Sequence, residues 1–182
     1  NRKGGLVENH KPKNIKTKYA KYKLLTTNYG VNNISNFFSI RSSYIYGYSQ
    51  RRDTLIDLLI KSIKFKKTIM MSHCKIYRDY IFVEDVAEAF YKIIFTNIPG
   101  GVYNVGSGKL ITLKKLISEI SKRSGFNKKY LKFGSLIKRK EQQAPKSFLI
   151  TKKINKYCDW KINNSLDEGI DKILKFNKIN TY

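Results

Sequence analysis

Histidine, cysteine and acidic residues are all scarce in this chain of 182 residues. It has two histidines and two cysteines, and only 13 acidic residues stand against 37 lysines and arginines. Cys74 and Cys158 lie far apart and form no Cys-x-x-Cys pair, and neither His10 nor His73 has carboxylates at metal-ligand spacing. The sequence therefore predicts neither a metal site nor a disulfide framework, and it is typical of a reducing compartment.

Long apolar runs and glycine-rich turns are also missing. No run approaches the roughly 20 apolar residues that cross a bilayer, and no charged-then-apolar leader opens the sequence. We therefore expect no membrane partner and a cytoplasmic location. The one Gly-x-Gly, Gly106-Ser107-Gly108, comes late in the chain and lacks a third glycine, so we do not expect it to bind dinucleotide phosphates.

The remaining composition suits a folded domain of strongly basic charge. Hydrophobic residues make up 41% and aromatic residues 13% of the chain, which is too apolar for a disordered polyelectrolyte. The net charge of +24 would fit nucleic acid as a partner. However, the charges are scattered, and lysine, asparagine, isoleucine and tyrosine all have AT-rich codons. We therefore favour codon bias over nucleic-acid binding, and an anionic small-molecule substrate remains compatible with the charge.

Helix and strand patterns alternate along the chain, which indicates the α/β class. After a loop over residues 1–16, helices are expected at 17–29, at 53–65, at 83–94, after a Thr112 cap and after a Ser165 capping box. Strands are expected at 37–40, 68–71, 77–83 and 102–105.

Tyr19 and Lys23 share one face of the first expected helix, because residues four apart are neighbours there. A lysine beside a tyrosine favours the phenolate, so such a pair can exchange protons without a histidine. The alternative is an ordinary amphipathic helix. Tyr157 and Lys161 have the same spacing, and the chain is rich in both residue types.

Five motifs follow one another along the chain. They are Tyr19/Lys23, then Ile40-Arg41 leading to Tyr46-Gly47, then Arg78-Asp79-Tyr80 leading to Asp85-Val86, then Tyr103-Asn104-Val105-Gly106, and finally Trp160 followed by Ser165-Leu166-Asp167-Glu168-Gly169. In this order they resemble the C-terminal half of the extended short-chain dehydrogenase/reductase family, the NAD-dependent nucleotide-sugar epimerases and dehydratases.

The resemblance implies catalytic and binding roles for five residues. Tyr19 would be the general acid/base, and Lys23 would hold the nicotinamide ribose of NAD or NADP, so both would be catalytic and cofactor-binding. Arg78 would pair with the diphosphate of a nucleotide diphosphate sugar, and Arg139 is a second diphosphate candidate. Tyr44 would border the substrate, where the family often has asparagine or a small residue.

Several residues have other readings from the sequence itself. Arg78 has a structural alternative, because Asp79 or Asp85 could pair with it as an ion pair. Asp85 is expected to cap or orient its helix, and Tyr157 and Trp160 are expected to be packing residues.

The resemblance also implies the C-terminal part of a Rossmann-like parallel sheet plus a smaller α/β substrate-binding lobe. We expect residues 1–47 and 79–106 to belong to the sheet part and residues 48–78 and 107–182 to the nucleotide-sugar-binding lobe. The family's glycine-rich cofactor turn, and the Ser or Thr of its catalytic set, would lie before Asn1.

The chain is therefore expected to be a fragment of an isomerase or lyase of carbohydrate biosynthesis, impaired or inactive alone. Its expected partners are a second copy in a homodimer or a chain that supplies the N-terminal half. The alternatives are a basic protein that binds nucleic acid or another polyanion, and a truncated remnant without activity.

Overall fold

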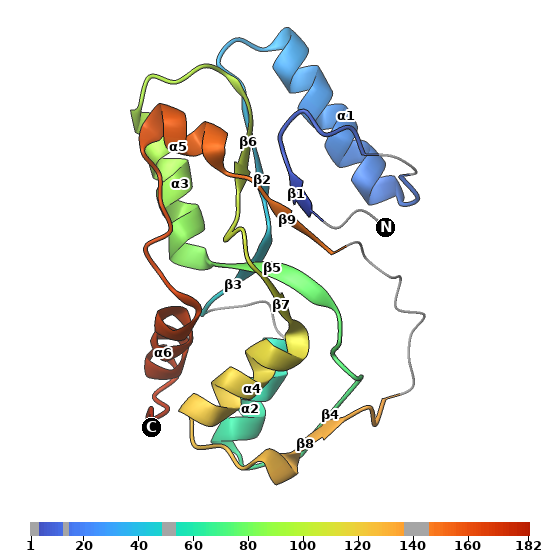
Figure 1. The fold of residues 1–182 in the computed structure, drawn as a ribbon, viewed down its shortest axis with the longest axis vertical. Coiled ribbons are helices and arrows are strands. Elements are labelled where there is room, and N and C mark those ends of the chain that lie inside the picture. The colour runs from blue at the N-terminus through green and yellow to red at the C-terminus, as the bar shows by residue number, and fades with distance from the viewer. Residues whose placement is uncertain (1–3, 13–14, 49–53, 137–145) are drawn as a thin grey trace.

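The computed structural model of the chain describes residues 4–12, 15–48, 54–136 and 146–182 (Figure 1). Its helices are α1 (Lys18–Asn33), α2 (Leu55–Lys64), α3 (Val83–Phe95), α4 (Leu113–Arg123), the 3-10 turn η1 (Lys128–Tyr130), α5 (Lys152–Cys158) and α6 (Leu166–Phe176). Its strands are β1 (Gly4–Leu6), β2 (Phe38–Ser42), β3 (Tyr44–Tyr46), β4 (Ile69–Met71), β5 (Tyr77–Phe82), β6 (Gly101–Val105), β7 (Leu110–Thr112), β8 (Leu131–Phe133) and β9 (Ser147–Leu149).

Parallel pairing dominates among the described strands. The pairs β1–β9, β2–β6, β3–β5 and β4–β8 are parallel, and β5–β7 is antiparallel. In the β2–β6 pair, Phe38 lies opposite Gly101 and Ser42 lies opposite Val105. Because the partners of each parallel pair lie far apart in sequence, long crossovers join them, which is the arrangement expected of the α/β class.

Helices lie on both sides of the β2–β6 pair. Figure 1 shows α1 on one side and α3 with α5 on the other, and all three helices contact the pair. The buried stripe of α3 contains Val86, Ala89 and Ile93, whose spacing of three and four residues lines up one helix face. With Ile154 of α5 and the fully buried Trp160, this stripe forms one of two apolar cores.

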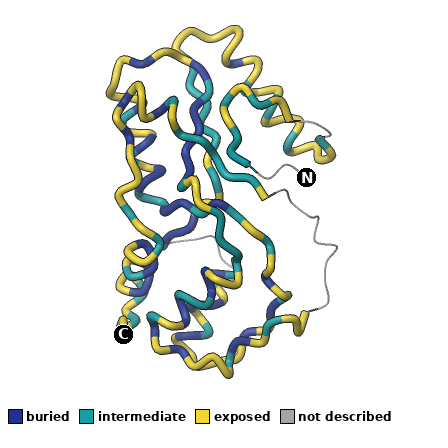
Figure 2. Tube along the Cα trace, viewed as in Figure 1, coloured by how far each residue is buried: buried dark blue, intermediate teal, exposed yellow. Residues whose placement is uncertain are grey.

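The second core lies between α2, α4 and α6. Leu59, Leu116 and Ile170, one from each helix, are completely buried in it. Figure 2 shows buried segments running through the middle of the molecule and along the facing sides of α2 and α4, with exposed outer loops. β4 and β8 close this core at its far end (Figure 1).

Side-chain caps fix the starts of four of the described α-helices. Thr17, Thr54 and Thr112 each accept a hydrogen bond from a backbone amide three residues further along. Ser165 and Glu168 form the complete capping box that the sequence predicts. Each such cap stabilises its helix by about 1 kcal/mol, because it satisfies an amide that has no partner inside the helix.

The ends of two elements compare with the sequence expectations as follows. α1, expected to end near Gly30 and Asn32-Asn33, ends at Asn33, and Gly30 is buried within the helix against the ring of Phe37. Residues 4–6, expected to be loop, form β1 by pairing with β9. A three-residue strand carries too little periodicity to be recognised in the sequence.

Within the described ranges, no helix has both the length and the apolar character needed to span a bilayer.

Candidate active site

Tyr19 and Lys23 lie on an exposed face of α1, close to its start. Thr17 begins the helix by accepting a hydrogen bond of 3.2 Å from the amide of Ala20. The Lys23 ammonium lies 4.9 Å from the centroid of the Tyr19 ring, and Tyr19 is 69% exposed. The structure therefore confirms the expected helix and the position of both side chains on one of its faces.

Tyr157 and Lys161, the second pair with this spacing, do not form such a face. α5 ends at Cys158, and Asp159 then takes a left-handed conformation with φ of 44°. Lys161 lies beyond this turn and pairs with Asp159 at 3.0 Å, while the ring of Tyr157 packs edge-on against Tyr103. Trp160 is buried and is a packing residue, as the sequence predicts, whereas Tyr157 is 39% exposed and packs only through its ring contact with Tyr103 among the described aromatic rings.

Tyr19 stands where two cavities meet. The first, of about 750 Å³, lies between α1 and β2 and is also lined by Lys23, Thr27, Ser39 and Arg41. The second, of about 640 Å³, lies between β3 and β9 and is also lined by Leu6, Ser42, Ser43, Tyr44, Ile45, Asp79, Ser147, Phe148 and Leu149. A phenol in this position can contact molecules in both cavities.

Arg78 lies against the rim of the second cavity by stacking on Tyr44. Its guanidinium carbon lies 4.8 Å from the centroid of the Tyr44 ring, and its Nη1 donates a 2.9 Å hydrogen bond to the carbonyl of Tyr77. Such stacking is a common mode of arginine packing, because the planar cation faces the π cloud. The structure therefore brings Tyr19, Tyr44 and Arg78, all predicted site residues, to one region.

The alternative role of Arg78 in an ion pair with Asp79 or Asp85 is wrong. Neither carboxylate forms an ion pair with Arg78 in the described part of the chain. Both are instead occupied by amide and hydroxyl donors from other segments.

Asp79 organises the wall of the second cavity, a role that the sequence does not reveal. It is 3% exposed and accepts hydrogen bonds from the amide and hydroxyl of Ser107 at 2.8 and 2.7 Å, from the Gly108 amide at 3.3 Å and from the Leu149 amide at 3.0 Å. A buried carboxylate needs such donors. The amides of the Gly106–Gly108 turn thus bind Asp79, which agrees with the prediction that this turn is not a phosphate loop.

Asp85 does not cap its own helix, so the first of the two roles that the sequence offers for it, to cap or to orient the helix, is wrong. The N-cap of α3 is Phe82, and it makes no side-chain cap. Asp85 Oδ1 instead accepts hydrogen bonds from the amide of Asn163 at 2.9 Å and from the side chain of Asn164 at 3.0 Å. The residue therefore fixes the segment that precedes α6.

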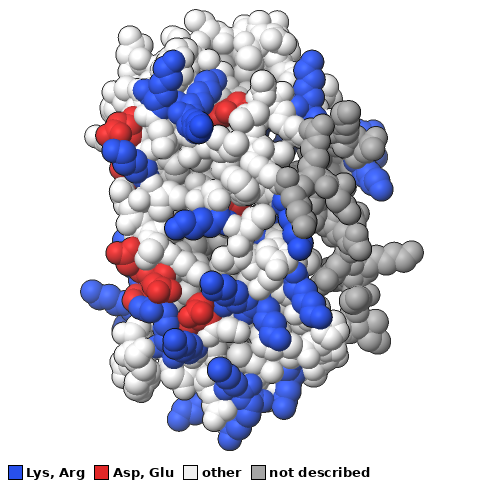
Figure 3. Space-filling model, in the orientation of Figure 1, with Lys and Arg blue, Asp and Glu red and all other residues white. Residues whose placement is uncertain are grey.

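Charged side chains are unevenly distributed over the surface. In Figure 3, lysines and arginines are dense over the half of the molecule that contains α2 and α4, and acidic residues gather between α3 and α6.

Arg139, the second diphosphate candidate, lies outside the described residues. Within the described part, no group of three or more His, Cys, Asp or Glu side chains is placed to hold a metal.

Comparison with known proteins gives a family match and two curated relatives. The sequence model of the NAD dependent epimerase/dehydratase family matches residues 8–106. CDP-abequose synthase of Salmonella muenchen is 28% identical over 144 residues, which cover 76% of this chain and 47% of the relative. dTDP-4-dehydro-6-deoxyglucose reductase of Escherichia coli is 32% identical over 142 residues, which cover 75% of this chain and 43% of the relative. The chain thus spans less than half the length of either relative.

Solved structures give the fold. The NAD complex of dTDP-glucose 4,6-dehydratase from Bacillus anthracis matches with a TM-score of 0.81 at 18% identity, over 98% of this chain and 57% of that one. The NAD complex of UDP-glucuronic acid 4-epimerase from Bacillus cereus matches with a TM-score of 0.75 at 23% identity, over the same shares of 98% and 57%. The predicted α/β, Rossmann-like class is therefore confirmed.

Proposed function

The chain belongs to the NAD-dependent epimerase/dehydratase family, and on this premise we propose that it is the C-terminal portion of an enzyme that oxidises or reduces a nucleotide-linked sugar. The observation that carries the proposal is the position of Tyr19 between two cavities, with Lys23 beside it. A proton donor that faces both a cofactor and a substrate is what hydride transfer to a carbonyl requires.

In this proposal, Tyr19 moves the proton at the sugar oxygen that is oxidised or reduced. Lys23, one turn away, stabilises the phenolate and binds the cofactor ribose. The nicotinamide, when bound, supplies or accepts the hydride. The exposed faces of Tyr19 and Lys23 and the 750 Å³ cavity beside them fit the ribose end of such a cofactor.

The chain's residues do not fit the pyrophosphate end of a dinucleotide. The Gly106–Gly108 turn has its amides bound to Asp79, and the sequence contains no other glycine-rich turn of this kind. We therefore propose that binding of NAD or NADP needs the N-terminal half of the fold, and that the chain alone has little or no turnover. The division into residues 1–47 with 79–106 and residues 48–78 with 107–182 belongs to the same proposal.

Arg78 is proposed to bind the substrate diphosphate. A guanidinium stacked on Tyr44 keeps its edge donors in one plane, and that plane suits a diphosphate oxygen pair. Arg139 is proposed as a second cation at the same diphosphate.

One relative is a reductase of a dTDP-linked 4-dehydro sugar, so keto reduction is the first reaction to test. Nothing in the comparisons supports the alternative of a nucleic-acid-binding protein.

Isothermal titration of the purified chain with dTDP-glucose tests the substrate half of this proposal. We expect saturable binding that Arg78→Ala weakens by at least about tenfold, since charge-assisted hydrogen bonds contribute roughly 1.5–3 kcal/mol each. Arg123→Ala is the matched control, because Arg123 lies on α4 and pairs with Asp167 and Asp171. Equal loss in both variants would refute a specific role for Arg78.

A second titration addresses the nucleic-acid alternative. Duplex DNA should bind weakly, and its binding should be unaffected by Arg78→Ala. Tight DNA binding that falls steeply with salt, together with no binding of dTDP-glucose, would overturn the proposal in favour of a polyanion-binding protein.

The proposal also predicts no NADPH-dependent reduction of a dTDP-linked 4-dehydro sugar by the chain alone. Clear turnover would contradict the proposal that the chain needs the N-terminal half of the fold.

A further inference from the structure

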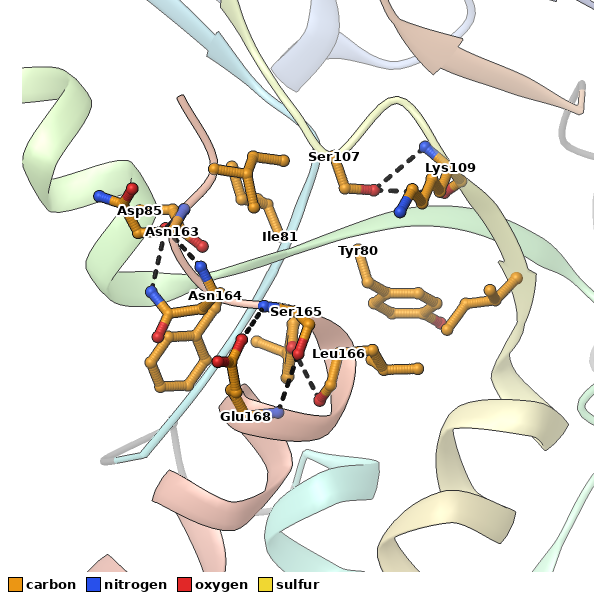
Figure 4. Close-up of a pocket in the computed structure, with 14 residues that line it drawn as sticks. Tyr80, Ile81, Asp85, Ser107, Lys109, Asn163, Asn164, Ser165, Leu166 and Glu168 are labelled. Carbon is orange, nitrogen blue, oxygen red and sulfur yellow. Dashed lines mark hydrogen bonds between the residues drawn. The ribbon is translucent and has the colours of Figure 1, made fainter. Parts of the chain in front are cut away.

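A third cavity, of about 500 Å³, lies between β5, the turn after β6 and the start of α6 (Figure 4). It shares no lining residue with either cavity at Tyr19. Its volume is within the range of roughly 300–1,000 Å³ found for small-molecule sites, which are mostly apolar with a few convergent polar groups. Half of its 14 lining residues are apolar or aromatic, namely Tyr46, Tyr80, Ile81, Phe82, Ile111, Ile162 and Leu166.

Asp85 gives this cavity a buried acceptor. It lines the cavity and is 1% exposed. Its Oδ1 accepts hydrogen bonds from Asn163 and Asn164, but its Oδ2 is buried and meets no donor in the described part of the chain. Buried carboxylate oxygens are almost always hydrogen-bonded, so Oδ2 is suited to a donor brought by a ligand.

The charges around the cavity favour a cation. Of the 13 acidic residues in this basic chain, six lie on α3 and α6. Four of these six form ion pairs with lysine or arginine, namely Glu84, Glu88, Asp167 and Asp171. The two that line the cavity, Asp85 and Glu168, have no ion-pair partner among the described residues.

The start of α6, which also faces the cavity, already holds a carboxylate. The amide of Glu168 donates to the hydroxyl of Ser165, and the amide of Ser165 donates to the Glu168 carboxylate. These bonds use amides that would otherwise attract an anion and place a carboxylate there. Lys109 is the single basic residue in the lining, against two carboxylates.

Tyr46, which also lines the cavity, is a buried tyrosine. Burial, followed by the charges of Asp85 and Asp167, raises the pKa of the Tyr46 hydroxyl. In Figure 4, Tyr80 and Lys109 lie on one side of the space, with Asp85 and Glu168 on the other. The cavity thus offers aromatic and aliphatic walls together with a negatively charged side.

We propose that this cavity is a binding site for a small organic cation with an apolar or aromatic body. Its ammonium group would be directed towards the Asp85 and Glu168 carboxylates, and its body would lie against Tyr46, Tyr80 and Phe82. Aromatic faces add cation–π attraction to the charge–charge attraction, and both act more strongly in a partly enclosed site.

Trp160 offers a direct probe of binding. It is the chain's single tryptophan, and its Nε1 donates a 3.0 Å hydrogen bond to the backbone carbonyl of Asp85. We would titrate the chain with 2-phenylethylamine and follow Trp160 emission. 2-Phenylethanol, which is neutral and of similar shape, and 3-phenylpropionate, which is an anion, are the matched ligands. The amine should bind at least about tenfold more tightly than the alcohol, and the anion should not bind.

Two substitutions test the assignment of the carboxylates. Glu168→Gln preserves the capping box, because glutamine can also accept from the N-cap amide, and it should weaken amine binding about threefold. Asp85→Asn should weaken it about tenfold. Glu119→Gln on α4 removes one charge away from the cavity and should leave affinity unchanged.

Three outcomes would overturn the proposal. The first is equal affinity for the amine and the alcohol. The second is no saturable signal up to about 10 mM amine, which is weaker than a specific site of this size should bind. The third is an equal effect of Glu168→Gln and Glu119→Gln. Since Glu168→Gln leaves the helix cap intact, it decides the matter even where Asp85→Asn prevents folding.

Discussion

The Arg78 guanidinium packs on the ring of Tyr44, 4.8 Å from its centroid, across the paired strands β3 and β5. Tyr44 lies opposite Tyr80 in this pair, so Arg78, two residues earlier, reaches Tyr44 diagonally. The family resemblance predicts asparagine or a small residue where Tyr44 stands. Here the position contributes an aromatic support for the arginine in addition to lining the second cavity.

This support predicts how substitutions of Tyr44 affect binding of dTDP-glucose. Tyr44→Ala should weaken binding about threefold, because the guanidinium loses a cation–π contact of roughly 0.5–1 kcal/mol. Tyr44→Phe keeps the ring and should bind like the unsubstituted chain. Titration calorimetry measures both. If Tyr44→Phe loses as much affinity as Tyr44→Ala, the hydroxyl rather than the ring is responsible.

Asp79 is predicted to be the most sensitive carboxylate for stability. Asp79→Ala would leave the amides of Ser107, Gly108 and Leu149 without their acceptor in a buried place. We expect a loss of about 3 kcal/mol in the free energy of unfolding, measured by urea denaturation. Asp167→Ala, whose carboxylate is 60% exposed in its pair with Arg123, should cost less than about 1 kcal/mol. Similar losses for the two would contradict this account.

The sequence predicts the long elements well, because their signals are local. Thr112 and the Ser165–Glu168 box mark helix starts, and the stripes of α3 and α4 follow a helical period. The contacts of Asp79 and Asp85 could not be predicted, since their partners lie 28 to 79 residues away. The spacing of Tyr157 and Lys161 equals that of Tyr19 and Lys23. Only the left-handed conformation of Asp159 distinguishes the second Tyr/Lys pair from the first. A sequence rarely indicates that a residue other than glycine will adopt this conformation.

A cluster around Glu84 is predicted to make stability depend on acid pH. The hydrogen bond from Lys172, followed by that from Tyr48, lowers the pKa of the Glu84 carboxyl below its ordinary value of 4.5. The stabilisation is therefore complete above pH 4.5 and is lost as the pH falls through the lower pKa of the folded state. Glu84→Gln should flatten the acid limb of a plot of melting temperature against pH.

Glu119→Gln is the control for this pH dependence, because it removes one carboxylate from α4 and leaves the Glu84 cluster intact. Its acid limb should match that of the unsubstituted chain. A Glu84→Gln variant that loses stability on acidification as steeply as the control would show that other carboxylates determine the acid limb.

Gly30 provides a test of how α1 packs on the sheet. A Cβ added there would lie 2.3 to 2.5 Å from the tip of the Phe37 ring, too close for any contact. Alanine improves helix propensity by about 1 kcal/mol over glycine, but forcing the ring aside costs roughly 1–3 kcal/mol. We expect Gly30→Ala to destabilise the chain by about 1 kcal/mol net, because the packing cost exceeds the gain in propensity.

The sign should reverse once Phe37 is shortened. In a Phe37→Ala background the added methyl group meets no ring, so Gly30→Ala should raise the free energy of unfolding by about 0.5–1 kcal/mol. Urea denaturation of the two single variants and the double variant measures this coupling. If Gly30→Ala has the same effect in both backgrounds, the ring of Phe37 is not the reason that glycine is needed at position 30. Close packing of α1 on Phe37 would then not be what holds the helix in place beside the candidate site.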